Sequence, residues 1–203
     1  MKIEFDAEKH QYYVDEKPVP SVTQICAPLG ADYDEPDDDM LELTVEAAAD
    51  RGATMHAYIE HRLSGGEPED FELPSQYQGY ADAVELFLAE HTITPYGIEQ
   101  PIACKYHAGT PDLTCEFDGN DAILDWKFVS QIAKSKVAAQ LGGYLDLCES
   151  GNYSPERLYA VQFLKDGTYR LYPVDLNFAG QAWDACYCVY GLKTYKHPRG
   201  RIG

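Results

Sequence analysis

Two aspartates and a lysine are the residues of this 203-residue chain whose types and spacing have the clearest chemical content. Asp125 and Lys127 lie two residues apart in a stretch with strand alternation, which places both side chains on one face. Asp112 begins a neighbouring strand, and the hairpin signal at 118–120 allows the two carboxylates to converge. Two adjacent carboxylates repel unless a cation lies between them, and oxygen ligands suit Mg²⁺ or Mn²⁺. A lysine on the same face could orient or polarise a metal-bound water, so the pattern predicts a hydrolytic metal site.

The pattern also has a simpler interpretation. Most Asp-x-Lys triplets are surface ion pairs, and an Asp-Gly-Asn hairpin such as 118–120 is common between strands. The combination of both acids, the lysine, the shared face and the connecting turn favours the metal site. The residues alone leave the surface ion pair open.

The N-terminal elements that would flank this site begin with a predicted β-hairpin over residues 3–14, which alternate apolar and polar. Pro18 and Pro20 are expected to end it. Ser21 then has the position of an N-cap for a short helix that reaches Cys26.

Two helices and a change of period follow. Apolar residues at three- and four-residue spacing predict a helix over 42–63, which Ser64-Gly65-Gly66 would stop, and a second helix over about 75–90. Pro95-Tyr96-Gly97 is expected to be a turn. From there the period is two, which predicts three strands, at 98–106, 112–118 and 121–129.

The last part of the chain predicts a helix over about 131–149, a hairpin of strands 158–164 and 168–174, and a helix over 178–190. The expected class is a mixed α/β (α+β) fold: a central mixed sheet, with a three-stranded antiparallel meander, flanked by helices, plus the N-terminal hairpin. The length predicts a single domain, residues 1–203. Within it we expect an N-terminal hairpin and acidic loop (1–40), a core (41–175), and a C-terminal helix with a basic tail (176–203).

Charge is distributed very unevenly. The formal net charge is −18, and all of the excess lies in residues 1–100, while residues 101–203 are neutral overall. A strongly acidic chain argues against a nucleic-acid partner, but this total says little about a site in the neutral half. The acids of 31–50, including Asp37–Asp39, fit either a solvated loop that runs into a helix N-terminus or a partner-binding loop.

Compartment signals are few. The N-terminus lacks the apolar segment of a signal peptide, and no apolar run is long enough to span a membrane. The six cysteines are scattered, mostly among apolar neighbours, and are expected to be reduced core thiols. These features predict a cytoplasmic protein with no membrane partner.

The order Gly-Thr-Pro-Asp112, twelve residues, then Asp125-Trp-Lys127 resembles the PD-(D/E)xK nuclease superfamily. Its RecB-like branch, which includes phage and CRISPR-associated exonucleases, is the more similar one. Gly52-Ala-Thr-Met-His56 resembles that branch's helical histidine motif, and Gln140-Leu-Gly-Gly-Tyr144 resembles its Gln-x-x-x-Tyr motif. Glu99, thirteen residues before Asp112, resembles an acid often found entering the first strand. The likeness covers about residues 3–165.

The resemblance implies a restriction-endonuclease-like core and assigns roles to particular residues. Metal ligands would be His56, Asp112, Asp125 and the main-chain carbonyl of Trp126. Lys127 would position the attacking water and stabilise charge in the transition state. Gln140 and Tyr144, one helical turn apart, would lie over the site and contact the DNA or the lysine.

The motifs on helices also have plainer interpretations. Taken alone, His56 fits a helix-surface histidine, and Gln140 with Tyr144 fits an amphipathic helix that has one buried tyrosine. The histidine motif also departs from the family pattern, with Gly-Ala-Thr in place of Gly-Thr at the usual offset. That departure puts the register of His56 in doubt.

The resemblance implies a DNA nuclease, an exonuclease in particular, that uses Mg²⁺ or Mn²⁺ and acts in a bacterial or phage-infected host cell. Some members of the branch hold an iron–sulfur cluster on one early cysteine and three late ones. Here only Cys186 and Cys188 are late, so no cluster is expected. The expected partner is DNA, as linear ends or single strands. A homo-oligomer and a recombination or replication protein remain open as partners.

Two other functions compete with this one. A catalytically silent nuclease-fold module that binds nucleic acid or protein would explain the acidic front half. An acidic DNA mimic that acts through 31–50 would leave the Asp-Trp-Lys motif unexplained. Strand polarity, exo- or endonuclease action, strandedness and the choice of DNA or RNA are not determined by the sequence.

Overall fold

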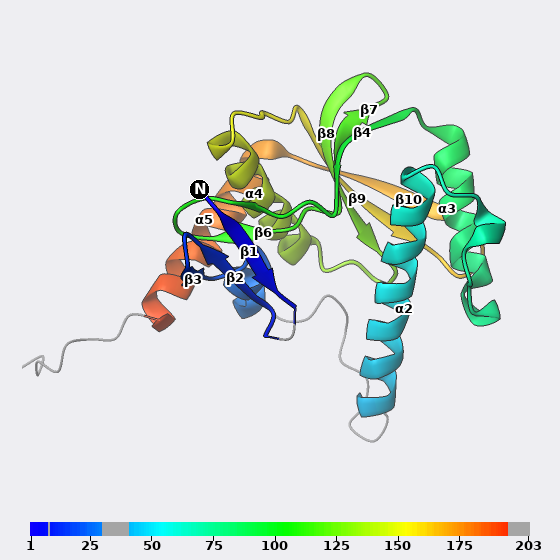
Figure 1. Ribbon diagram of the computed structural model, residues 1–203, viewed down its shortest axis with the longest axis horizontal. Coiled ribbons are helices and arrows are strands. Elements are labelled where there is room, and N and C mark those ends of the chain that lie inside the picture. Colours follow the sequence, from blue (N-terminus) through cyan, green and yellow to red (C-terminus); the bar gives the residue numbers. More distant parts are fainter. Residues whose placement is uncertain (8, 30–40, 195–203) are drawn as a thin grey trace, which may run out of the picture.

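The computed structural model describes residues 1–7, 9–29 and 41–194, with side chains from residue 47 onward in the last range. Its centre is a five-stranded sheet of order β10-β9-β8-β7-β4 (Figure 1). The strands are β4 (Ile93–Ile98), β7 (Leu113–Phe117), β8 (Asn120–Lys127), β9 (Arg157–Phe163) and β10 (Tyr169–Val174). All neighbours are antiparallel except β8 and β9, which are parallel. The sheet is therefore mixed, as the sequence predicts.

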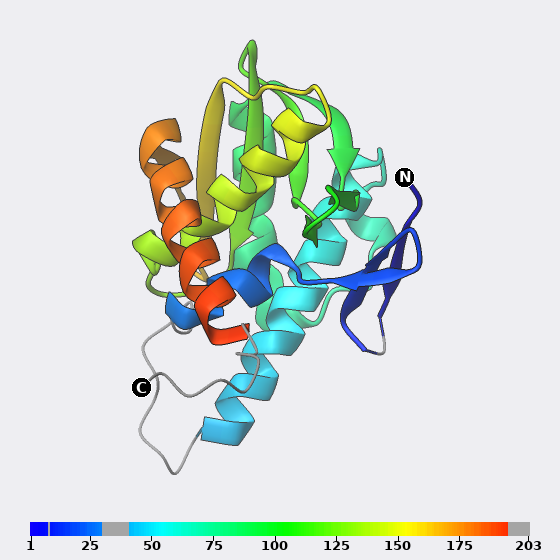
Figure 2. The same ribbon diagram turned by 90° about the vertical axis from the view of Figure 1, so that its left-hand side faces the viewer.

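The parallel pair requires a crossover, because antiparallel neighbours can be joined by a tight turn and parallel ones cannot. The crossover contains α4 (Lys134–Ser150), which packs with α5 (Leu176–Thr194) and α1 (Val22–Cys26) on one face of the sheet. The opposite face is covered by α2 (Leu41–Leu63) and α3 (Gln78–Glu90). Figures 1 and 2 show these two helical layers on either side of the strands. The expected mixed α/β architecture with flanking helices is confirmed.

The strand alternation of β8 divides the core in two. Leu124 and Trp126 pack with α2 and α3, whereas Ile123 packs with α4 and α5. Asp125 and Lys127 have the same parity as Ile123, so their side chains face α4. This placement follows directly from the predicted alternation.

The N-terminal hairpin, β1 (Ile3–Asp6) with β2 (Gln11–Val14), is confirmed, but Pro18 does not end it. Pro18 lies inside a third strand, β3 (Lys17–Val19), at the edge of this small sheet. An edge strand tolerates proline because one side of it needs no hydrogen-bond donor. Ser21 caps α1 as predicted, and its hydroxyl accepts from the Gln24 amide at 3.0 Å.

The predicted strand at 98–106 and the turn at Pro95–Gly97 are wrong. The strand β4 lies earlier, at Ile93–Ile98, and includes the three turn residues, with a bulge between Pro95 and Gly97. Because β4 is an edge strand, it accommodates both the proline and the extra residue. Residues 102–103 and 108–109 instead form a two-stranded ladder, β5 (Ile102–Ala103) and β6 (Ala108–Gly109).

The remaining predicted elements agree with the structure within a few residues. They are the helices α2 to α5, the β9–β10 hairpin and the tight turn between β7 and β8. Short 3₁₀ turns lie at Ala27–Leu29, Pro68–Asp70 and Ser75–Tyr77. Within the described ranges no helix has the length and apolar character needed to cross a bilayer.

Two groups of residues discussed from the sequence lie outside the described residues. They are the acidic run Asp37–Asp39 and the basic tail with Lys196, Arg199 and Arg201. The cysteines are expected to be core thiols, and four of the six are buried: Cys26, Cys115, Cys148 and Cys186. Cys104 is half-buried and Cys188 is exposed.

Candidate functional site

Asp112 immediately precedes β7, and Asp125 lies on the neighbouring strand β8. The β7–β8 register pairs Leu113 with Leu124, so the residue before β7 stands beside Asp125. The Asp112 carboxylate is buried and its Oδ2 accepts the Trp126 amide at 2.6 Å. That bond fixes the carboxylate against β8 and leaves its other oxygen, Oδ1, 3.6 Å from His56 Nδ1.

Asp125 and Lys127 form an ion pair under helix α4. The Asp125 side chain is 0 % exposed and the Lys127 side chain 11 %, with Nζ 2.8 Å from Oδ2. Burying a carboxylate this completely is unfavourable unless a charge compensates it, and Lys127 supplies that charge. The surface ion pair that the sequence left open is therefore not what the structure shows.

Helix α4 contributes a polar pair to the same place. Gln140 Oε1 accepts from Lys127 Nζ at 3.3 Å, and Gln140 Nε2 donates to Tyr144 Oη at 3.1 Å. Both side chains are buried, and burial raises the pKa of Tyr144 well above its usual value. A chain of polar contacts thus runs from Asp125 through Lys127 and Gln140 to Tyr144.

Gly109 on β6 permits this position of Tyr144. A Cβ at Gly109 would lie 2.8 Å from Cε1 of the tyrosine ring and 3.1 Å from Val22. The ring therefore packs directly on the β6 backbone. The glycine of the Gly-Thr-Pro-Asp segment has a packing role that its sequence position did not reveal.

His56 reaches the same region from α2 on the other face. Its Nδ1 lies 2.9 Å from Glu99 Oε1 and 3.6 Å from Asp112 Oδ1. The ligand atoms of His56, Glu99 and Asp112 lie within 4.8 Å of one another, which is close enough for a shared cation. Among the described residues Asp125 is not part of this group.

The electrostatics of the group favour a positive charge. Burial lowers the pKa of His56, but the negative charge of Asp112 and the hydrogen bond with Glu99 outweigh it and raise the pKa to about 9. The pKa of Asp112 is raised, because burial disfavours its charged form more than His56 and Lys127 favour it. A place that binds a proton this readily also attracts a metal ion, which competes for the same donors.

Glu99 is the member of this group that the sequence left without a firm role. The hydrogen bond from its amide to the Asp112 carbonyl, at 3.0 Å, continues the β4–β7 pairing beyond Ile98. Its φ of 44° turns the chain at the end of the strand. The strand predicted at 98–106 would have placed Glu99 inside a strand, where its position beside Asp112 is not evident. Because β4 ends at Ile98, Glu99 lies across from Asp112.

The donor set fits a divalent cation. One imidazole nitrogen and two carboxylates are the mixed nitrogen and oxygen ligands that Mn²⁺ accepts, and Mg²⁺ takes the oxygens. A ligand role for Asp125 and for the Trp126 carbonyl stays a prediction. The Trp126 amide has a different and visible role as the donor to Asp112.

The sequence matches no protein-family model and no curated protein. Among solved structures, an alkaline exonuclease (LHK-Exo) from Laribacter hongkongensis matches with a TM-score of 0.40 at 11% identity, over 86% of this chain and 89% of that one. The same enzyme in complex with dAMP gives a TM-score of 0.38 at 12% identity with the same coverage. The protein SSO0001 gives 0.37 at 13% identity, over 93% and 82%.

Proposed function

We propose that this protein is a metal-dependent nuclease that hydrolyses phosphodiester bonds of DNA, as an exonuclease acting on linear ends. The observation that carries the proposal is that two groups of polar residues meet at strand β8. A nitrogen and carboxylate donor group (His56, Glu99, Asp112) is joined by the Trp126 amide to the strand that carries Asp125 and Lys127. The family pattern of the sequence supports the same reaction.

The donor group would hold Mg²⁺ or Mn²⁺, with Asp125 joining it when its pairing with Lys127 loosens. A divalent cation held there would supply an activated water and positive charge beside the scissile phosphate. Two carboxylates and an imidazole held within 4.8 Å need no large movement to surround one ion. Their preorganisation lowers the cost of binding it.

Lys127 is proposed to orient the attacking water and to stabilise the negative charge that develops on the phosphate oxygens. Its ammonium is held from two sides, by Asp125 at 2.8 Å and by Gln140 at 3.3 Å. The Gln140 contact would keep the lysine aimed when Asp125 turns to the cation. Tyr144 holds the Gln140 amide in the orientation that presents oxygen to the lysine. In this proposal Gln140 and Tyr144 act as positioning residues.

The proposed domain is the whole chain, in which segments far apart in sequence build one site. The test is digestion of end-labelled linear DNA with Mg²⁺ or Mn²⁺ and with a chelator. We expect Asp112→Asn and Lys127→Ala to lower the cleavage rate by at least about 100-fold, the usual effect of removing one electrostatic contact to the transition state. Asp121→Asn and Lys165→Ala are matched controls, since Asp121 lies at the far end of β8 and Lys165 in the β9–β10 turn.

Covalently closed circular DNA separates the two modes of cleavage, because only an endonuclease can open it. Equal rates in wild type and in both site variants would contradict the proposed site. Binding of DNA with no cleavage under any divalent cation would instead support the silent, nucleic-acid-binding alternative.

A further inference from the structure

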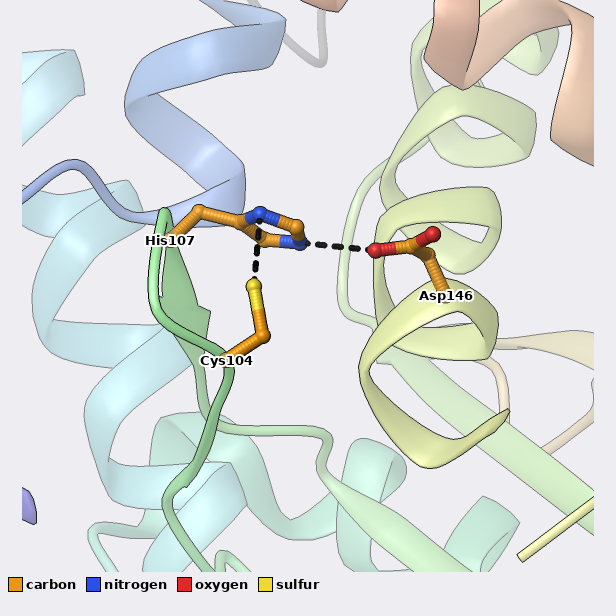
Figure 3. A group of neighbouring side chains, drawn as sticks. All are labelled: Cys104, His107 and Asp146. Carbon is orange, nitrogen blue, oxygen red and sulfur yellow. Dashed lines mark hydrogen bonds and ion pairs between the residues drawn. The ribbon is translucent and has the colours of Figure 1, made fainter. Parts of the chain in front are cut away.

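A second cluster of ligand side chains lies away from the proposed nuclease site. Cys104 and His107 stand at either end of the turn between β5 and β6, and Asp146 is on α4. Figure 3 shows the three side chains converging from the turn and from the helix. Taking one ligand atom from each residue, the three atoms lie within 4.8 Å of one another.

The imidazole of His107 lies between the other two side chains. Its Nδ1 is 3.3 Å from Cys104 Sγ, and its Nε2 is 3.2 Å from Asp146 Oδ2. The residue is 3 % exposed, and its buried Nε2 makes no hydrogen bond to the described residues, because the contact with Asp146 lacks hydrogen-bond geometry. A buried nitrogen and a carboxylate oxygen that approach without sharing a proton are suited to share a cation.

Backbone hydrogen bonds around Cys104 close the turn that carries the cysteine and the histidine. The Cys104 amide donates to the His107 carbonyl at 3.0 Å, which closes the Cys-x-x-His turn. The Tyr106 amide donates to Cys104 Sγ at 3.4 Å. The sulfur and the imidazole are therefore carried on one short turn, with Sγ beside the ring.

His107 is enclosed by its neighbours on the remaining sides. The rings of Trp183 and Tyr187 pack on the imidazole, with centroids 4.9 and 5.7 Å away. The cluster also borders a cavity of about 490 Å³ that can admit a water as a further ligand.

We propose that Cys104, His107 and Asp146 form a second metal site, which binds Zn²⁺ or a similar transition metal. Sulfur, nitrogen and oxygen together suit Zn²⁺, whereas Mg²⁺ takes oxygen ligands alone. The site would be separate in residues and in chemistry from the donor group at His56, which contains no sulfur. It does not depend on the proposed nuclease function.

A cation here would join the β5–β6 turn to helix α4. These two elements are far apart in the sequence. The same helix carries Tyr144, which already packs on Gly109 of β6. In the present arrangement, His107 Nδ1 faces the Cys104 sulfur and Nε2 faces the Asp146 carboxylate. Binding of one cation by all three residues therefore requires the half-buried Cys104 side chain to turn toward Asp146. The cavity beside Cys104 leaves room for that rotation.

The experiment titrates the full-length protein with Co²⁺ and then displaces it with Zn²⁺. We expect a thiolate-to-cobalt charge-transfer absorption band from one site per chain, because only a sulfur ligand produces that band. Cys104→Ser should abolish the band, while Cys188→Ser, on an exposed cysteine of α5, and His56→Ala should retain it. Retention in His56→Ala separates this site from the proposed nuclease centre.

Asp146→Asn tests the third ligand with a nearly isosteric change at a partly exposed side chain. We expect it to weaken Zn²⁺ binding at least about 10-fold, within the range that loss of a partner in a metal site produces. No charge-transfer band in the wild type, or a band that persists in Cys104→Ser, would overturn the proposal. An unchanged Zn²⁺ affinity in Asp146→Asn, with the variant folded by circular dichroism, would equally contradict the three-ligand site.

Discussion

Gln140 shows how a single side chain can fix several others. Its amide presents oxygen to Lys127 and nitrogen to Tyr144, so one rotamer satisfies a buried charge and a buried hydroxyl together. A residue that uses both ends of its amide in this way has no conservative replacement among the apolar residues.

We expect Gln140→Ala to lower the free energy of unfolding by about 1–3 kcal/mol, because the Tyr144 hydroxyl and the Lys127 ammonium both lose a buried partner. Urea unfolding measures this change. In the cleavage assay the rate should also fall. Gln140→Glu restores an oxygen for the lysine and should recover part of the rate, which a merely structural role would not produce.

His56 gives the metal-free protein a pH-dependent stability. Its pKa is raised to about 9 from an ordinary value of 6.5, so the folded state binds this proton more tightly than the unfolded state does. The stabilisation is therefore complete below about pH 6.5 and is lost as the pH rises through about 9. Because the His56 side chain is 31 % exposed, solvent screens part of the interaction, and we expect it to contribute roughly 2 kcal/mol to the free energy of unfolding.

Denaturant unfolding of the chelator-treated protein at several pH values between about 6 and about 9 measures this effect. His56→Gln should remove most of the decline in the free energy of unfolding with rising pH. A His56→Gln curve parallel to that of the wild type would show that the decline has another source.

Among the elements, α2 and α3 are joined by an ion pair with unusually good geometry. Arg62 Nε donates to Glu85 Oε1 at 2.7 Å and Nη2 donates to Oε2 at 2.9 Å, while Tyr58 Oη donates to Oε1 at 2.7 Å. Burial raises the pKa of Glu85, but the bonds from Arg62 and Tyr58 outweigh it and lower the pKa below its ordinary 4.5. Three donors to one carboxylate fix the two helices relative to each other.

We expect Glu85→Gln to lower the free energy of unfolding by about 1–2 kcal/mol at neutral pH, since charge-assisted bonds are lost. Because the folded pKa is lowered, this contribution is complete above about pH 4.5 and is lost as the pH falls through the lowered value. The difference between wild type and variant should therefore shrink in acid. Glu60→Gln, at an exposed glutamate of α2, is a suitable control.

Helices α4 and α5 pack closely because glycine removes side chains from α4. A Cβ at Gly142 would lie 2.1 Å from the Ala179 carbonyl oxygen, which is main chain and cannot move aside locally. A Cβ at Gly143 would collide with Trp183 and Val22 instead. The two glycines of the Gln-x-x-x-Tyr motif therefore set the distance between the helices.

We expect Gly142→Ala to destabilise the protein by about 2–3 kcal/mol, because α5 must shift to accommodate the methyl group. Gly180→Ala on α5 is the matched control, since a Cβ there meets nothing within 4 Å. That change should be neutral or stabilising by up to about 1 kcal/mol through helix propensity. Thermal melts of the two variants distinguish packing from propensity, and equal effects would contradict the close-packing argument.

At the scale of the whole molecule, charge and site are separated along the sequence. The formal charge is −18, but the segment after residue 100 is neutral and contributes Asp112, Asp125 and Lys127. DNA approaching the proposed site must still overcome the repulsion of the entire chain.

We expect the cleavage rate at low DNA concentration to rise when monovalent salt increases from about 0.01 M to about 0.1 M. Over that range the Debye length falls from about 30 Å to about 10 Å, which screens the long-range repulsion. A basic nuclease shows the opposite trend, because salt weakens its phosphate contacts. Initial rates at constant Mg²⁺ measure the effect, and a steady fall with salt would show that a local basic surface dominates.

The sequence by itself determined the elements whose signals are local. The Ser21 cap, the spacing of apolar residues in α2 and α4, and the alternation that puts Asp125 and Lys127 on one face depend on neighbours in the chain. It failed around Pro18 and Pro95–Gly97, where local turn preference was overridden because each proline lies in an edge strand.

Only the tertiary structure decided which side chains meet. Glu99 joins His56 and Asp112 because β4 pairs with β7 and α2 packs on that face of the sheet. Asp146 reaches His107 because α4 crosses the β5–β6 turn. The His56–Glu99 and His107–Asp146 contacts join residues more than 35 positions apart. No local pattern encodes them, since they depend on strand order and helix packing.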